Sequence, residues 1–195
     1  MLIYSIKSNH FILMRAITIL IITLLLLHLS SPWCLKTMAN LTSEVTRIDY
    51  SPDGTKIVVT STSANTVAVY DTTNFFNTFT FTPSSSTVNV ARFSKDGTYI
   101  GVGLSSGRVE LISGNAPFSN TVLFNFQPRG DTIVDLDFNY ANDKMVICYS
   151  DDDRFEIVDN YDNNGARADR SEDMGDNSFA CRFSMNDDVV ISRDN

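Results

Sequence analysis

The chain has 195 residues, of which 43% are hydrophobic and 19% are charged, and its formal net charge is −8. These fractions are typical of a globular protein that buries a core, and they argue against a disordered chain. The acidic balance argues against nucleic-acid binding, because contacts to phosphates require clustered Lys and Arg. Abundant Asn, Asp, Ser and Thr favour turns over long helices.

Residues 1–39 contain a hydrophobic leader. The apolar run Ala16–Leu29 has 14 residues and follows Arg15, an arrangement typical of a secretory signal. The run is shorter than the ~20 residues that span a bilayer as a helix, and extending it back to Phe11 would bury Arg15. The sequence predicts a cleaved signal peptide and a secreted or luminal protein. An uncleaved signal anchor in the membrane, or a misplaced start, is the alternative. Asn40 begins a glycosylation sequon that matters only on the secretory route.

From residue 43 onward the chain repeats itself. Four segments share an alternating apolar strand that ends in an aromatic residue and a turn. The aromatic residues are Tyr50, Phe93, Phe138 and Phe183, spaced 43, 45 and 45 residues apart. The turns contain Asp-Gly or Asn-Asp, which supply the backbone angles that a tight hairpin needs. A period of about 40–45 residues with several short strands is typical of β-propeller blades.

Each repeat is predicted to contain four antiparallel strands, the first of which is buried and ends in the aromatic residue. The second strands are expected at 56–60, 99–103, 144–149 and 189–192, the third at 66–71, 108–112 and 154–159, and weaker fourth strands at 77–82, 121–126 and 168–173. The sequence therefore predicts an all-β domain over residues 40–195, with three complete four-stranded blades and two strands of a fourth. A single blade buries too little surface to be stable alone.

In these features residues 43–195 resemble the WD-repeat family. Tyr50–Gly54 and Phe93–Gly97 match the turn after the family's inner strand, and Val69-Tyr70-Asp71 matches the aromatic-Asp end of its third strand. The resemblance implies a WD-repeat-like β-propeller or a related divergent propeller found outside cells. The family's Gly-His pair is missing, so the hydrogen-bonded tetrad that locks its blades is not expected here.

The number of blades leads to a further expectation. The family closes its ring with about seven blades, whereas this chain supplies about three and a half. Either the rest is missing from the chain or a partner supplies it. A partial ring would leave open sheet faces and unpaired strand edges, which favour self-association or partner binding.

Catalytic chemistry has few candidates in this sequence. No His follows His28, which excludes Ser-His-Asp, Cys-His and histidine-rich metal sites from the mature chain. Asp135 and Asp137 are spaced to share a strand face with Ile133. We expect them to line a solvated central channel rather than to form a buried pair with shifted pKa values.

The loop at residues 160–165 is a candidate metal site. Asn160, Asp162 and Asn164 place oxygen-bearing side chains at alternate positions before Gly165, as calcium loops require. The expected distal acid is displaced, because Asp169 and Glu172 each lie one residue past the ninth and twelfth loop positions that supply ligands in such loops. An Asn/Gly-rich hairpin is therefore the favoured interpretation and a calcium loop the alternative. No other cofactor is expected.

The three cysteines, Cys34, Cys148 and Cys181, show no CxxC spacing, so zinc and thioredoxin-type sites have no support. Cys148 and Cys181 fall in predicted strands, where an apolar role is favoured. A disulfide between them in an oxidising compartment is the alternative.

These features predict a non-enzymatic protein-binding or scaffolding propeller, with loops on a rigid scaffold making the contacts. The expected partner is a protein or a second copy, with no nucleic acid, and the membrane is involved only through an uncleaved leader. The alternative is a fragment of a secreted propeller hydrolase or lactonase that holds calcium in its channel. Such an enzyme needs several acids at the channel mouth, for which the candidates are Asp49, Asp135 and Asp137.

Overall fold

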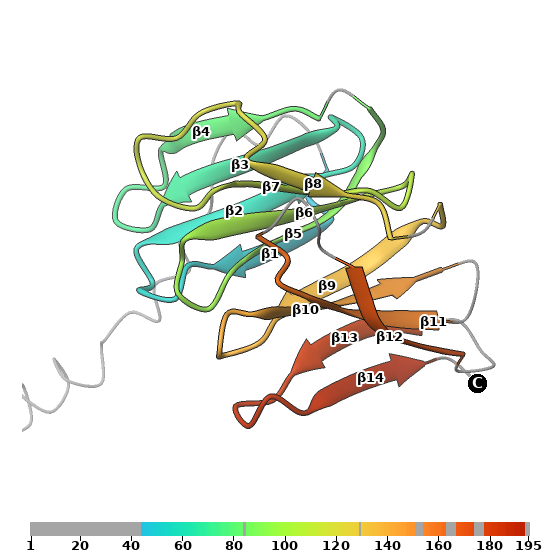
Figure 1. Ribbon diagram of the computed structural model, residues 1–195. Coiled ribbons are helices and arrows are strands. Elements are labelled where there is room, and N and C mark those ends of the chain that lie inside the picture. Colours follow the sequence, from blue (N-terminus) through green and yellow to red (C-terminus); the bar gives the residue numbers. More distant parts are fainter. Residues whose placement is uncertain are drawn as a thin grey trace, which may run out of the picture. The chain divides into compact units, whose positions relative to one another are not determined.

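The computed structural model describes residues 44–83, 85–128, 130–150, 154–162, 167–173 and 178–193 (Figure 1). The predicted leader at residues 1–39 lies outside these ranges, as does Asn164. In the part described, no helix is long and apolar enough to cross a membrane. The described elements are all β-strands, which confirms the all-β prediction.

Three four-stranded antiparallel sheets and one two-stranded sheet follow one another along the chain. The first sheet contains β1 (Arg47–Tyr50), β2 (Lys56–Ser61), β3 (Thr66–Asp71) and β4 (Asn77–Phe81). The second contains β5 (Val88–Phe93), β6 (Tyr99–Leu104), β7 (Val109–Ser113) and β8 (Phe124–Phe126). The third contains β9 (Ile133–Phe138), β10 (Lys144–Tyr149), β11 (Arg154–Asp159) and β12 (Arg167–Asp173), and the fourth contains β13 (Ser178–Phe183) and β14 (Val189–Arg193).

The same turn joins the first two strands of every sheet. Gly54 and Gly97 adopt φ values of 69° and 75°, which glycine reaches without steric cost. Asn142 and Asp187 occupy the equivalent positions at φ values of 56° and 61°, a region that Asn and Asp tolerate better than most residues. The Asp-Gly and Asn-Asp signals in the sequence therefore mark real hairpin turns.

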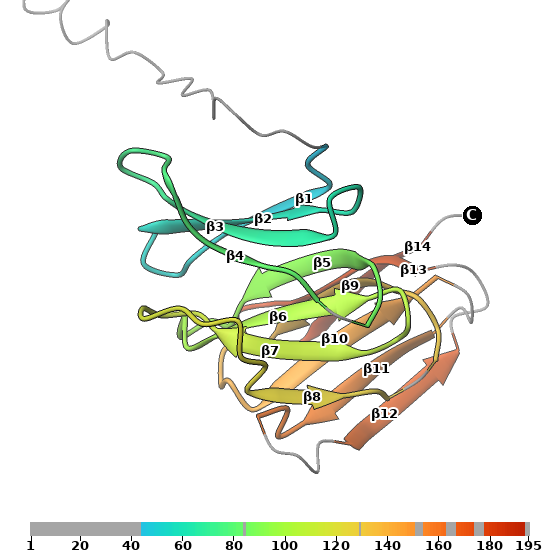
Figure 2. The ribbon, with the colours of Figure 1, turned by 90° about the horizontal axis from the view of Figure 1, so that it is seen from above.

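The sheets pack face to face in chain order through three apolar clusters. The first cluster joins the first and second sheets and includes Val58 and Phe93. The second joins the second and third sheets around Phe138, and the third joins the third and fourth sheets around Phe183. The first strands contact one another, β1 with β5, β5 with β9 and β9 with β13, whereas β4, β8 and β12 spread apart at the outside (Figure 2). This arrangement is consistent with part of a β-propeller.

One aromatic residue departs from the prediction that each ends a buried first strand. Phe93, Phe138 and Phe183 are buried, but Tyr50 is 58% exposed. The equivalent phenylalanines pack toward the preceding sheet, and within the described ranges no sheet precedes β1. The exposed apolar side chains of β1 do not continue onto β2, because the cross-strand neighbours of Ile48 and Tyr50 there, Val59 and Ile57, are buried. The open face is thus narrower than a whole sheet.

Candidate functional site

Charged residues gather where the first strands meet. The residue before each aromatic alternates between acid and base along the repeats, in the order Asp49, Arg92, Asp137 and Arg182. Because side chains alternate along a strand, these residues point to the face opposite the aromatics. Together with Asp135 and Lys95 they form a group that we call the inter-sheet charge cluster.

Asp135 is the most heavily paired member of this cluster. Its Oδ1 lies 3.1 Å from Nη2 and 3.2 Å from Nε of Arg92 on the second sheet. Its Oδ2 accepts a hydrogen bond from Nη1 of Arg182 on the fourth sheet. Asp135 is 2% exposed, and this burial raises its pKa while Arg92 opposes the shift. One carboxylate on the third sheet therefore links the sheets on both sides of it.

Two further carboxylates join neighbouring sheets through backbone groups. The first strands lie at sheet edges, where some N–H groups have no partner within the sheet. Oδ2 of Asp49 accepts from the N–H of Phe93 at 3.0 Å, and Oδ2 of Asp137 accepts from the N–H of Phe183 at 2.9 Å. Nζ of Lys95 donates to Oδ1 of Asp137 at 2.8 Å. These bonds lock the sheets together in a chain that lacks the Gly-His tetrad.

The expectation of a solvated channel lined by Asp135 and Asp137 is wrong. Both residues are 2% exposed and both are ion-paired. They also do not share a face with Ile133. The register of β9 against β10 shifts between Ile133 and Asp135, so Ile133 packs with Leu136 and Phe138 instead. A β-bulge of this kind adds one residue and inverts the alternation beyond it.

The inter-sheet charge cluster is suited to holding sheets together rather than to holding a metal. Its three carboxylates are already matched by Arg92, Lys95 and Arg182. Among the described residues, no group of three or more His, Cys, Asp or Glu is placed to bind a metal ion. Burial raises the pKa of Asp49, and the hydrogen bond from the N–H of Phe93 opposes this rise. A buried site whose charges are already paired disfavours the binding of an additional ion.

The candidate calcium loop is described only in part. Asn160 adopts a φ of 51° and its N–H donates to the carbonyl of Asp143 at 2.7 Å. Asp162 is exposed, and Asn164 lies outside the described residues. Glu172 pairs in register with Phe155, so it lies at the far end of the strand from this loop. The calcium loop stays a prediction.

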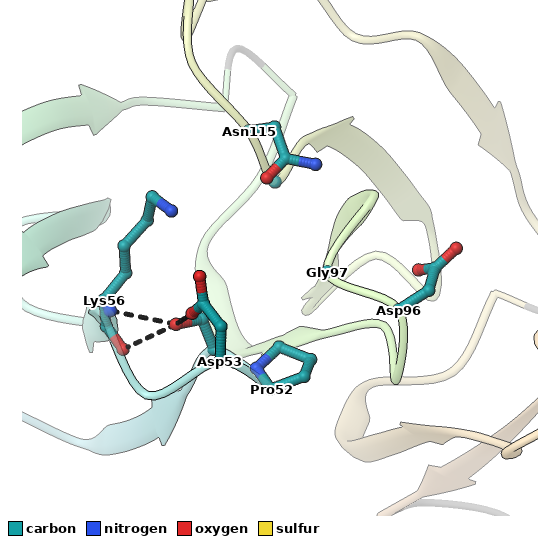
Figure 3. A pocket seen from close by; sticks show the side chains of 8 residues that line it. Pro52, Asp53, Lys56, Asp96, Gly97 and Asn115 are labelled. Atoms are coloured by element: carbon teal, nitrogen blue, oxygen red, sulfur yellow. Dashed lines mark hydrogen bonds between the residues drawn. The ribbon is translucent and has the colours of Figure 1, made fainter.

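A small pocket lies between the first two sheets and has a volume of about 110 Å³. Its walls are the turn from Ser51 to Lys56, residues Asp96 and Gly97, and residues Gly114 and Asn115. In Figure 3 the side chains of Asp53, Lys56 and Asn115 border the opening. Asp53 is already held by Ser51 Oγ at 2.6 Å and by Thr55, and these bonds lower its pKa to about 2. Its carboxylate therefore stabilises the turn.

The sequence reasoning missed the cations of the inter-sheet charge cluster. Arg92, Lys95 and Arg182 were not singled out, although the Asp–Arg alternation before the aromatics was visible in the four aligned segments. It predicted open sheet faces but did not place Ile48 and Tyr50 of β1 on one; they are 59% and 58% exposed. On the fourth sheet Val190 is exposed as well. These side chains are the candidate binding surfaces.

Comparison with known proteins supports the fold and not a family. No protein-family model matches the chain, and no curated protein matches it. Among solved structures 1218 chains match, so the fold is too widespread to select a function. One of them is hydrazine synthase from Kuenenia stuttgartiensis, with a TM-score of 0.65 and 14% sequence identity. The match covers 80% of this chain and 45% of that chain. At this identity the similarity shows the arrangement of four-stranded antiparallel sheets alone.

Proposed function

We propose that the chain is a divergent WD-repeat-like β-propeller module that binds a protein partner, without catalysis, in the secretory pathway or outside the cell. The motifs at Tyr50–Gly54 and Phe93–Gly97, the face-to-face sheets and the contacts between first strands support the propeller assignment. The apolar leader supports the location.

The observation that carries the binding function is the exposure of β1. Ile48 and Tyr50 are 59% and 58% exposed, whereas Ala91 and Phe93, which hold the same positions in the second sheet, are buried. The repeat thus places large apolar side chains where the other sheets have a neighbour. Exposed apolar side chains grouped on one face favour association with another surface. A partner that covers β1 would bury these side chains as Phe93 is buried by the first sheet.

Charge favours a different protein over a second copy as this partner. Between the second and third sheets, Arg92 meets Asp135, which lies three residues before the aromatic Phe138. The corresponding position before Tyr50 is Arg47. If a second copy stacked its fourth sheet on β1, Arg182 would approach Arg47, and like charges would oppose the contact. A partner with an acidic residue beside an apolar face fits better.

The charge cluster also favours binding over the propeller hydrolase alternative. A channel calcium ion needs several free carboxylate oxygens, but Asp49, Asp135 and Asp137 already bind cations and backbone N–H groups. We therefore expect no rise in the melting temperature of the wild-type protein in millimolar calcium. A calcium-dependent rise that Asp162→Ala abolishes would instead support the loop at residues 160–165.

The binding function is tested with the protein recovered from secretory cells. Replacing Ile48 and Tyr50 with Ser should reduce hydrophobic-dye binding and the amount of co-purifying partner, because both readouts depend on the exposed β1 side chains. Phe76→Ser is the matched control, since Phe76 is 72% exposed but lies outside β1. A wild-type protein that sediments as a compact monomer without binding dye would contradict the proposal.

The location is tested separately. In secretory cells Asn40 should carry a glycan, visible as a mobility shift that a glycosidase removes, unless leader cleavage lies too close. Replacing Asn40 with Gln should remove the shift. A cytosolic protein with an intact leader would refute the secretory assignment and leave the binding surface unaffected.

A further inference from the structure

Two buried cysteines with free thiols lie at the interface of the third and fourth sheets. Cys148 lies on β10 and Cys181 lies on β13, and both are fully buried. They belong to one apolar cluster with Val146, Phe155 and Phe183. β10 and β13 come from different sheets that are in contact.

Backbone geometry places the Cys181 thiol beside Cys148. Sγ of Cys181 lies 3.6 Å from the carbonyl oxygen of Asp135, and its N–H lies 3.3 Å from Asp135 Oδ2. Asp135 is the register partner of Cys148 on the adjacent strand. Burial raises the pKa of Cys181 well above its usual value, and the nearby Cys148 thiol raises it further. The Cys181 thiol therefore lies against the strand pair that carries Cys148, within the same apolar cluster.

We propose that Cys148 and Cys181 form a disulfide that joins the third and fourth sheets when the chain folds in an oxidising compartment. The oxidant is a small-molecule disulfide such as oxidised glutathione. One cysteine thiolate attacks it and releases one glutathione thiol; the second cysteine then attacks the mixed disulfide and releases the other. One S–S bond breaks, one forms, and the two cysteine protons end on the two glutathione thiols.

Burial determines when this exchange takes place. The thiolate is the reactive species, and the packed interface disfavours it at Cys181. Exchange therefore proceeds before the two sheets pack or while they are locally open. Once formed, the bond ties the two-stranded fourth sheet to a four-stranded neighbour. By restricting the unfolded chain it should raise the melting temperature by roughly 5–10 °C.

The test uses the full chain, purified with reductant in mild detergent and then refolded in equimolar reduced and oxidised glutathione. Free thiols are alkylated under denaturing conditions, and peptides are mapped by mass spectrometry. We expect a Cys148–Cys181 linked peptide and an alkylated Cys34. Alkylation of both Cys148 and Cys181, or their linkage to Cys34 instead of to each other, would overturn the proposal.

The melting temperature is a second readout, and its main comparison uses only the wild-type protein. The melting temperature of the wild-type protein should be higher in the oxidised than in the reduced state. Cys34→Ala is the matched control and should keep this difference, whereas Cys181→Ala should lose it. Equal melting temperatures of oxidised and reduced wild-type protein would show that the bond, if formed, does not join the sheets in the folded state.

Discussion

The ion pair between Arg92 and Asp135 should contribute measurably to the stability of the sheet stack. Replacing Arg92 with Met keeps the apolar stem but removes the guanidinium that lies 3.1 Å from Asp135 Oδ1 and 3.7 Å from Asp49 Oδ1. The carboxylate of Asp135 would then remain buried between the second and fourth sheets with Arg182 as its single cationic partner among the described residues. We expect Arg92→Met to destabilise the protein.

The magnitude follows from burial and from the remaining partner. The side chain of Arg92 is 11% exposed and that of Asp135 is 3% exposed, so solvent screens this pair weakly. Removing one partner of a buried ion pair costs about 3–5 kcal/mol. Arg182 still neutralises Asp135, which offsets part of the loss. We expect a loss of about 3 kcal/mol in the free energy of unfolding, at the lower end of that range.

A double-mutant cycle measured by denaturant unfolding isolates the pair. Arg92→Met, Asp135→Asn and the double variant should give a coupling energy of about 2 kcal/mol. Arg47→Ala is the control, because Arg47 is an exposed arginine on a first strand, and its loss should cost under about 0.5 kcal/mol. A coupling energy no larger than the effect of Arg47→Ala would refute the locking role of the cluster.

Three further predictions test the sheet packing and the turn. Gly103→Ala should cost about 1–3 kcal/mol in denaturant unfolding, because an added Cβ would lie 2.6 Å from Cγ2 of Ile133; an unchanged midpoint would refute the close approach of β6 and β9. Phe93→Ala should cost about 3–5 kcal/mol but Tyr50→Ala under about 1 kcal/mol, and equal losses would contradict their different burial. The pKa of Asp53 is lowered to about 2 from 3.8, so its contribution is present above pH 4 and lost as the pH falls toward 2. Wild type should therefore lose more melting temperature than Asp53→Asn on acidification from pH 5, and parallel curves would refute this.

Local signals explain why the strands were predictable from the sequence. The alternation up to Tyr50 and Phe93, followed by Asp-Gly, specifies a strand and a hairpin turn within about ten residues. Third strands such as Thr66–Asp71 were found at their predicted bounds. The fourth strand of the second sheet was shorter than predicted, at Phe124–Phe126, where it pairs with β7 over three residues.

Packing between sheets was less predictable because it joins residues about 45 positions apart. Strand periodicity placed Asp135 and Asp137 on one face, but the bulge after Ile133 depends on register with β10. The burial of both acids depends on Arg92 and Arg182 from other sheets. The exposure of Tyr50 depends on the absence of a covering sheet among the described residues. None of these features follows from local sequence preference.

Hydroxyl-radical footprinting of Tyr50 tests partner docking at β1 most directly. Tyr149 and Tyr161 serve as internal references, because they are 0% and 1% exposed whereas Tyr50 is 58% exposed. Protein recovered from secretory cells is separated into monomeric and assembled fractions before oxidation. The proposed function predicts that Tyr50 is oxidised in the monomer, that it is protected in the assembly, and that both reference tyrosines are protected throughout. A Tyr50 that is equally reactive in both fractions would show that the partner binds elsewhere, and a Tyr50 protected in the monomer would show that β1 is already covered.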